Sequence, residues 1–592
     1  MSDLTSPNPS RRAHSRAPAI IGLACAFLLF AALAASMHTR PFLPPKVAQE
    51  HMEYWLLEGA KRVAGEVRLR HLRNIEPFYL RRDYMPVWLD NYELTAAGKE
   101  LLELLRETAV DDWRNYGYSL DTLEREMLRM HNQPEHATAI EVLLTDAFLS
   151  YAEQSLNNEL LPDTGEADHP TVKKVILSGS DRITPDHLTS LLTEAVRQNR
   201  MDDLLASLAP QHEGYRRLRA ELSRYRAIDR TGVWRPLPHS LALSAGDRHA
   251  DVPYLRWLLD QYGDLPQGAL SWLFNGNEDI PLPERIANPD LTQAHYLFDG
   301  PLRTAMSNFQ ERHNLKVTGT LTPETISQLN VPPYQVAQRI ALNMKRWRHL
   351  PDDLGKRHIM VNMADFRLEL VNQGQAELDM KVIVGNLERR TPVMTDLLRI
   401  IDIAPTWTVP HRIAGSYLLP KLKRNPNYLH QKGFDVIQWR KGKAVKVDTA
   451  GIDWKKYSAK RLPYTFVQRP GKDNALGRVK FLFPNDQSIY LHDTSQPQLF
   501  KLDKRALSSG CVRVEKPREL AEKLLATQGN WERSRINDAI DKNRTNRIRL
   551  KEPVPVHLMY WTTWVDDHGR LQVRDDIYQR DLIGGTAQHA SL

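Results

Sequence analysis

The spacing of apolar residues predicts helices through the first half of the chain. Leu188, Leu191, Leu192 and Val196 recur at three- and four-residue spacing, which places them on one face of a helix. Similar spacing occurs in residues 98–108, 136–156 and 212–228. No pattern of metal-ligating residues accompanies these helices, so we expect residues 38–280 to form a helical scaffold domain without chemistry of its own.

A second pattern lies between residues 281 and 333. Apolar residues line a helix that ends in Phe309-Gln310, Gly319 marks a turn, and Thr322-Pro323 supplies the cap and first position of another helix. This combination resembles the small three-helix type of peptidoglycan-binding domain, which implies that the segment binds the cell wall. A plain helical hairpin is the alternative. Residues 334–357 are expected to form a linker helix.

At His358 the periodicity changes from helical to alternating. Residues 359–363 and 367–371 have the pattern of strands, and Asn372-Gln373-Gly374-Gln375 forms a hairpin turn that leads to a third strand, residues 378–385. The pattern predicts a mostly-β domain over residues 358–580. With the helical segments before it, the chain is expected to be a multidomain α+β protein.

The β pattern is interrupted at about residues 412–478, which are basic and rich in turn residues. We interpret them as an insertion, with an ordinary solvated loop as the alternative. Residues 515–526 and 533–542 have the pattern of helices. Residues 554–573 are predicted to form a β-hairpin that completes the sheet.

The N-terminus carries an export signal. After Arg11, Arg12 and Arg16, residues 17–37 contain no charge, and a helix of that length spans about 30 Å. This predicts a transmembrane anchor, with residues 1–16 in the cytoplasm and the rest of the chain exported. A cleaved signal peptide is the alternative, because Ala32-Leu33-Ala34 has the small residues of a cleavage site.

Length and charge narrow the class of protein. A chain of 592 residues is too long for one core, and three or four domains are expected. The formal net charge of +8 suits an acidic partner. Because both interpretations of the N-terminus export the chain, we expect no nucleic-acid partner, and a cell-wall polymer bearing carboxylates is the better electrostatic match.

Cys511 is the only thiol that follows the N-terminal apolar stretch, which contains Cys25. It cannot form a disulfide within the exported part of the chain. It lies in the run Ser508-Ser509-Gly510-Cys511, and His492 precedes it by nineteen positions. A thiol nucleophile with a nearby imidazole base is typical of an acyl-transferring cysteine enzyme. A buried, inert cysteine is the alternative.

Three runs of residues then identify a family resemblance. They are Val384-Gly385 with Arg390-Thr391-Pro392-Val393, then Pro405-Thr406-Trp407-Thr408-Val409-Pro410, and finally residues 492–513. Together they resemble the catalytic domain of L,D-transpeptidases of the YkuD type, and their order fits the large, membrane-anchored YcbB-like branch, in which an insertion forms a lid. Many relatives have a histidine where this chain has Ser509 and an asparagine where it has Arg513.

The resemblance and the chemistry of the residues suggest roles for each. Cys511 is the expected nucleophile and His492 the expected base, which would lower the thiol pKa by forming an ion pair. Backbone N–H groups at Gly510 and Cys511 are expected to hold the oxyanion. Arg513 is expected either to bind a substrate carboxylate or to orient the loop. The remaining predicted site residues are Ser509, as a hydrogen-bonding loop residue, and Tyr490 and Trp407, as pocket walls or, for Trp407, core packing.

The resemblance implies a periplasmic L,D-transpeptidase held at the inner membrane, or exported after signal cleavage. Such an enzyme joins peptidoglycan stem peptides by 3→3 cross-links through a cysteine thioester and uses no cofactor and no metal. Its expected partners are the stem peptides, the inner membrane and other cell-wall synthesis proteins. Resolution of the thioester by water or by a lipoprotein lysine, and a non-catalytic wall-binding scaffold, remain alternatives.

Overall fold

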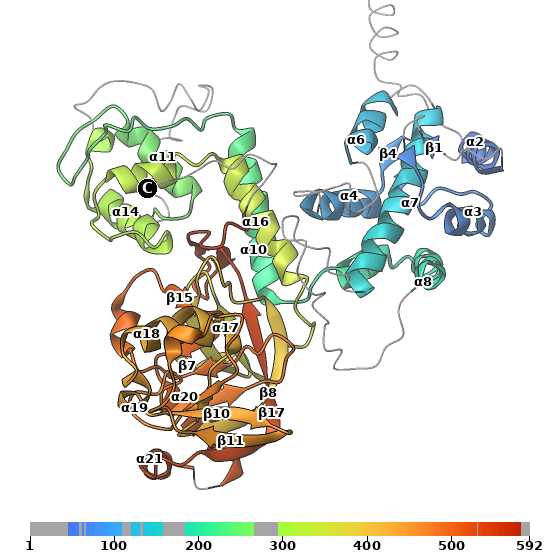
Figure 1. The fold of residues 1–592 in the computed structure, drawn as a ribbon. Coiled ribbons are helices and arrows are strands. Elements are labelled where there is room, and N and C mark those ends of the chain that lie inside the picture. Colours follow the sequence, from blue (N-terminus) through green and yellow to red (C-terminus); the bar gives the residue numbers. More distant parts are fainter. Residues whose placement is uncertain are drawn as a thin grey trace, which may run out of the picture. The chain divides into compact units, whose positions relative to one another are not determined.

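The computed structural model describes residues 45–57, 62–63, 67–90, 92–108, 120–130, 134–157, 184–265, 294–529 and 531–581 (Figure 1). The chain divides into two compact units, residues 1–156 with 183–208, and residues 157–182 with 209–592. The predicted anchor, residues 17–37, lies outside the described residues. Within the described part, none of the helices combines the length and the apolar character needed to cross a membrane.

The first unit is helical, as the apolar spacing predicts. Its longest helix, α7 (Pro134–Asn157), is mostly buried. Glu141 on this helix accepts hydrogen bonds from the backbone N–H groups of Trp88 and Leu89, both at 3.0 Å, and thereby fixes the preceding loop. The other helices are α2 (Pro45–Leu57), α3 (Leu72–Leu80), α4 (Ala96–Thr108), α6 (Leu120–Arg129), α8 (Pro185–Arg197) and α9 (Met201–Leu208), and two short hairpins are β1–β2 (Arg62–Val63, Val67–Arg68) and β3–β4 (Leu89–Asp90, Glu93–Leu94).

The second unit begins with helices α10 (Glu213–Arg230), α11 (Val252–Gln261), α14 (Gly300–Arg312), α15 (Pro323–Leu329) and α16 (Pro333–Trp347). The helix start predicted at Thr322 is present, because its hydroxyl accepts a 3.3 Å hydrogen bond from the N–H of Thr325. Gly319 has a φ of +66°, as a turn glycine requires. Residues 266–293 lie outside the described part, so the predicted wall-binding domain is described only from residue 294 onward.

A nine-stranded sheet forms the centre of the second unit, in the order β15-β7-β16-β14-β13-β8-β17-β5-β6. An additional pairing of β6 with β7 closes this sheet on itself. Gln373 and Gly374 in the turn before β7 have φ values of 51° and 80°, which is the left-handed backbone of a tight hairpin. The strands are β5 (Arg357–Asn362), β6 (Arg367–Asn372), β7 (Gln375–Gly385), β8 (Met394–Ile403), β13 (Val479–Leu482), β14 (Leu491–His492), β15 (Ala506–Ser508), β16 (Val512–Val514) and β17 (Asn546–Met559).

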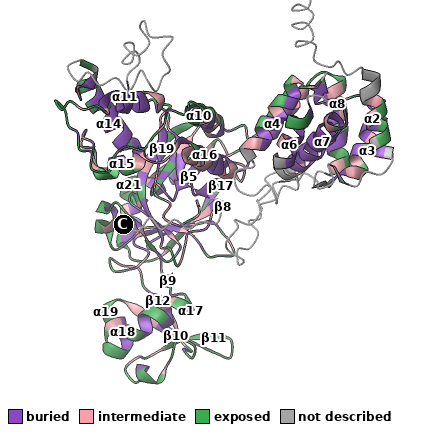
Figure 2. Ribbon diagram, turned by 90° about the horizontal axis from the view of Figure 1, so that it is seen from above, coloured by how far each residue is buried: buried purple, intermediate pink, exposed green. Residues whose placement is uncertain are grey.

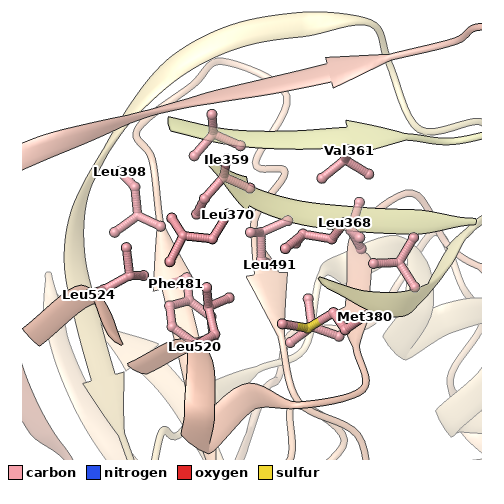
Figure 3. Packing of buried hydrophobic residues seen from close by; sticks show 14 of the residues in the cluster. Ile359, Val361, Leu368, Leu370, Met380, Leu398, Phe481, Leu491, Leu520 and Leu524 are labelled. Atoms are coloured by element: carbon pink, nitrogen blue, oxygen red, sulfur yellow. The ribbon is translucent and has the colours of Figure 1, made fainter. Parts of the chain in front are cut away.

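One face of this sheet encloses an apolar core, so the residues that alternate with the core residues lie on the opposite face. Phe481 and Leu491 are fully buried in it, beside Leu520 and Leu524 of α20 (Pro517–Leu525) (Figure 3). Val512 is fully buried in the same core. Helix α21 (Arg533–Asp541) covers the same core. Because successive strand residues point to opposite faces, the neighbours of Phe481, Leu491 and Val512 along their strands point away from this core.

The insertion is a folded subdomain rather than a loop (Figure 2). Its antiparallel sheet has the order β11-β10-β12-β9, and its own core includes Leu422, Val436, Trp454 and Phe466. The sequence analysis missed the hairpin β10–β11 because most of β11 is exposed on both faces and lacks apolar alternation. The elements are β9 (Trp407–Thr408), α17 (His411–Ile413), the π-helix η3 (Ala414–Leu418), α18 (Leu419–Arg424), α19 (Tyr428–Gln431), β10 (Phe434–Arg440), β11 (Lys443–Val447) and β12 (Thr465–Gln468).

The prediction that the C-terminal hairpin completes the large sheet is wrong. Strand β17 joins that sheet, but β18 (Thr563–Val565) and β19 (Leu571–Val573) form a separate two-stranded sheet. Trp561, just before β18, stacks on Trp347 of α16 with 4.2 Å between ring centroids. Packing against the helices of this unit therefore takes the hairpin out of the large sheet.

Candidate active site

The predicted base lies in a row of charged residues that crosses the large sheet. His492 on β14 is paired in register with Lys480 on β13 and with Arg513 on β16. Lys480 is in turn paired with Asp402 on β8, and Asp402 with Arg547 on β17. The row lies on the face opposite the apolar core, because its members alternate with buried Phe481 and Leu491. The imidazole is thus flanked by a cation on each neighbouring strand.

The predicted nucleophile lies in the tight turn between β15 and β16. Gly510 has a φ of +118°, which favours glycine at this position. The hydroxyl of Ser508 accepts a 3.1 Å hydrogen bond from the N–H of Gly510 and donates a 2.5 Å hydrogen bond to the carbonyl of Cys511. Ser508 therefore holds the turn that presents the thiol.

A buried network of hydrogen bonds holds this turn against the end of β7. Thr391 donates a 2.7 Å hydrogen bond to the carbonyl of Gly510 and accepts one of 2.8 Å from the N–H of Gly385. Tyr578 donates to the carbonyl of Gly385 at 2.7 Å. A side chain at Gly385 would lie 2.0 Å from the carbonyl oxygen of Arg389, so only glycine fits there. These contacts give the Val384-Gly385 and Arg390-Thr391 runs a structural purpose.

His492 is oriented by a main-chain carbonyl. Its Nδ1 is 2.5 Å from the carbonyl oxygen of Asp493, and since a carbonyl only accepts, Nδ1 carries the proton. A hydrogen bond to the carbonyl of Leu476 also acts on the imidazole, and both carbonyls raise its pKa. Burial, then the charge of Arg513, lowers the pKa of His492 to about 3, and Lys480 acts in the same direction. The imidazole is therefore neutral at neutral pH.

The expected ion pair between His492 and Cys511 is not formed in this structure. Among the described residues no hydrogen bond joins the two side chains, and the thiol donates to the carbonyl of Ser488 at 3.7 Å. Burial raises the pKa of the Cys511 thiol, while Tyr490, Lys480 and Arg513 act to lower it. The resting pair is thus a thiol and a neutral imidazole, because burial disfavours both charged forms.

The main-chain donors near the thiol are not equivalent. The N–H of Gly510 is bonded to Ser508, so it is not free to hold an oxyanion as predicted. The N–H of Cys511 has no hydrogen-bond acceptor within the described part of the chain. Of the two predicted oxyanion donors, the structure leaves the N–H of Cys511 available.

Arg513 and Ser509 lie on either side of the turn. Arg513 makes one long hydrogen bond of 3.4 Å from Nη1 to Gln496, and its buried Nε has no hydrogen-bond partner. Such a guanidinium retains donors for a substrate carboxylate. Ser509 accepts a 3.0 Å hydrogen bond from Arg389, which agrees with the expected loop role.

Tyr490 and Trp407 connect the thiol to the insertion. The Tyr490 ring lies edge-on to His492, with 5.6 Å between centroids, and its hydroxyl is within hydrogen-bonding reach of the Cys511 thiol. The Trp407 side chain is within hydrogen-bonding reach of the same hydroxyl. Trp407 also packs on the insertion core, 6.3 Å from the ring of Phe434. Both expected roles of Trp407, pocket wall and core packing, are therefore compatible with its position.

The insertion concentrates the positive charge of the protein. Residues 412–478 contain sixteen Lys and Arg against four Asp, a formal net charge of +12, so the remaining residues together carry −4. Most of these cations are exposed. Tyr417 of the insertion interacts electrostatically with Arg513, so this part of the insertion lies near the strand that follows the nucleophile.

The sequence analysis missed several residues of this site, namely Ser508, Thr391, Tyr578 and Lys480. Ser508 and Thr391 lie within the quoted motifs, so their position was the only available signal. Lys480 had no signal, because a lone lysine in a short strand is typical of a solvated surface. Among the described residues, no group of three or more His, Cys, Asp and Glu side chains is arranged to hold a metal ion.

Comparisons with known proteins give a family match for both parts of the chain. Residues 356–555 match the family model of the L,D-transpeptidase catalytic domain, YkuD, and residues 73–222 match that of a scaffold domain. A Haemophilus influenzae protein, whose name assigns it provisionally to the L,D-transpeptidases, is 39% identical over 246 residues. The match covers 42% of this chain and 48% of that relative, so the chain spans about half the length of the protein it matches.

Proposed function

We propose that this chain, which contains an L,D-transpeptidase catalytic domain, is an enzyme that forms 3→3 cross-links between peptidoglycan stem peptides. The observation that carries the proposal is the presence of Cys511, on its glycine turn, together with an oriented and neutral His492 in a domain of this family. The YcbB-like branch, with its inserted lid, remains the subfamily we propose.

In the proposed reaction, the imidazole of His492 takes the thiol proton as Sγ of Cys511 attacks the carbonyl carbon of the third stem residue. The N–H of Cys511 holds the oxyanion. Collapse of this intermediate breaks the bond to the terminal D-Ala, whose nitrogen receives the proton from His492. The low pKa of His492 makes the imidazolium a strong acid for this step. A side-chain amine of a second stem then attacks the thioester and gives a proton to His492. The bond to Sγ breaks, and His492 returns the proton to the departing sulfur of Cys511.

The charge of the insertion supports stem peptides as the substrate. Stem peptides carry free carboxylates, and a surface of net charge +12 beside the thiol raises their local concentration. A folded subdomain over the site also excludes water, which favours an amine acceptor over hydrolysis. Arg513, with its unpaired Nε, is the residue we propose to bind a substrate carboxylate.

The proposed setting is the periplasm, where the N-terminal segment anchors the chain to the inner membrane or is cleaved after export. Residues 281–333 are proposed to bind the wall. Replacing them by a short linker should reduce turnover on intact sacculi more than on soluble tetrapeptides, since a wall-binding module raises local concentration. Equal losses on both substrates would assign the segment a structural role.

The deciding experiment is mass analysis of muropeptides after incubation of tetrapeptide substrate with the full chain in detergent. A 3→3 dimer and free D-Ala are expected from the wild type, and neither from Cys511→Ala. Tripeptide without dimer would instead indicate an L,D-carboxypeptidase. Incorporation of a lysine-bearing peptide would indicate lipoprotein attachment. Unchanged substrate with folded wild-type protein would favour a non-catalytic wall-binding scaffold.

A further inference from the structure

Among the described residues, Lys480 is a cation near the nucleophile that has no carboxylate partner. Asp402, its cross-strand neighbour, already accepts two hydrogen bonds of 2.8 Å from Nε and Nη2 of Arg547. Among the described residues, Lys480 makes no hydrogen bond and no ion pair shorter than 4.0 Å with any acidic group. The ammonium of Lys480 therefore takes no part in the ion pair between Arg547 and Asp402.

The ammonium of Lys480 lies instead over an aromatic ring. Its Nζ is 3.9 Å from the centroid of the Tyr490 ring, which is the geometry of a cation–π contact. The same ring meets His492 edge-on, and its hydroxyl is within hydrogen-bonding reach of the Cys511 thiol. A cation on the face of a phenol withdraws electron density from the ring, so the hydroxyl becomes a stronger hydrogen-bond donor.

We propose that Lys480 is a positioning residue for the nucleophile: through the Tyr490 ring it strengthens the hydrogen bond to Sγ of Cys511 and favours the thiolate that forms when His492 takes the proton. The proposal rests on the proposed role of Cys511 as nucleophile. It names a group that acts through another and touches neither substrate nor product.

The other charged and titratable groups around the thiol do not replace Lys480. His492 is neutral at neutral pH, and Arg513, on the neighbouring strand, adds a second cation without contacting Tyr490 in any described interaction. Tyr417 of the insertion faces Arg513. Asp402 favours the charged form of Lys480 while burial opposes it. In the part of the chain that the structure describes, only Lys480 combines a positive charge with contact to the phenol ring.

The test is the pH dependence of alkylation of Cys511 by iodoacetamide, followed by peptide mass so that Cys25 does not contribute. In Lys480→Met the kinetic pKa of Cys511 should rise by about one unit, which reduces the rate at neutral pH by about tenfold, because a nearby cation favours the thiolate. Lys480→Arg keeps the charge and the ring contact and should stay within about threefold of the wild type. Lys551→Met, which removes an exposed cation from β17 of the same sheet, is the matched control and should change nothing.

The role of Tyr490 is tested by repeating the comparison in a Tyr490→Phe background. There, Lys480→Met should have a smaller effect, since the hydroxyl through which the charge acts is absent. An unchanged kinetic pKa in folded Lys480→Met overturns the proposal, and an equal shift in both backgrounds overturns the route through Tyr490. If Lys480→Met does not fold, Lys480→Gln serves in its place. Alkylation needs no wall substrate, so failure of the proposed function would show in the muropeptide assay and leave this test readable.

Discussion

The hydroxyl of Thr391 donates a 2.7 Å hydrogen bond to the carbonyl of Gly510, the residue before the nucleophile. It also accepts from the N–H of Gly385, so one buried side chain links the end of β7 to the turn that carries Cys511. Both hydrogen-bond partners of this hydroxyl are main-chain groups. The side chain at position 391 therefore controls the shape of the turn.

Replacing Thr391 by Val should therefore misplace the thiol. The buried carbonyl and N–H lose their partner, which costs about 1–3 kcal/mol of unfolding free energy. Because a small displacement of a reacting group lowers the reaction rate strongly, kcat/KM for dimer formation should fall by about tenfold to a hundredfold. Thr391→Ser keeps the hydroxyl and should recover most of the activity. Full activity in Thr391→Val would show that the turn does not depend on this contact.

The contact between Trp407 and Tyr490 predicts that the insertion and the nucleophile are coupled. Trp407→Phe keeps an aromatic ring against the insertion core but removes the indole N–H near the Tyr490 hydroxyl. We expect a several-fold lower rate of Cys511 alkylation and of dimer formation. Trp439→Phe is the matched control, since the Trp439 side chain is 64% exposed and lies at the end of β10. Equal effects of the two substitutions would contradict a specific role for Trp407.

The basic insertion should make substrate binding dependent on salt. Replacing Lys421, Lys423, Arg424, Lys441 and Lys443 by Gln should raise KM for tetrapeptides most at low ionic strength, because salt screens over a Debye length of about 8–10 Å near physiological strength. If the insertion mainly excludes water, shortening it should shift products from dimer to tripeptide. The dimer-to-tripeptide ratio across a salt series separates the two effects. A variant that changes neither KM nor this ratio would support an ordinary solvated surface.

Buried histidines should make the catalytic domain sensitive to mild acid. His557 receives a hydrogen bond from Thr395 and donates one to the carbonyl of Leu354, each at 3.0 Å, and burial lowers its pKa to about 4. Its folded pKa lies below the unfolded value of 6.5, so its stabilisation is present above pH 6.5 and is lost as the pH falls toward 4.

The difference in pKa of His557 corresponds to at most about 3 kcal/mol of unfolding free energy. His557→Gln should therefore flatten the fall in melting temperature between pH 7 and pH 4.5, as measured by calorimetry. His568→Gln, at an exposed position in the turn before β19, should keep the wild-type slope. A slope in His557→Gln equal to that of the wild type would exclude His557 as the titrating group.

Much of the architecture follows from local sequence. The hairpin of β6 and β7 was predicted because apolar alternation and Asn372-Gln373-Gly374 lie within one short segment. Helix α15 was predicted from the Thr322 cap for the same reason. The C-terminal hairpin was placed in the wrong sheet, since its residues indicate a hairpin but not which surface will bury it.

The candidate site divides in the same way. The sequence by itself determined the thiol, the imidazole and the glycine turn. These residues lie in two short motifs, Ser508 to Arg513 and the segment around His492, and their residue types indicate their chemistry. Only the tertiary structure decided that Lys480 and Arg513 flank His492. It also decided that the hydroxyl of Ser508 accepts a hydrogen bond from the N–H of Gly510, and that burial keeps the thiol and the imidazole neutral. The physical reason is that strand register, solvent exclusion and electrostatic interaction depend on distances in space, and residues far apart in the chain acquire those distances only when the sheet closes.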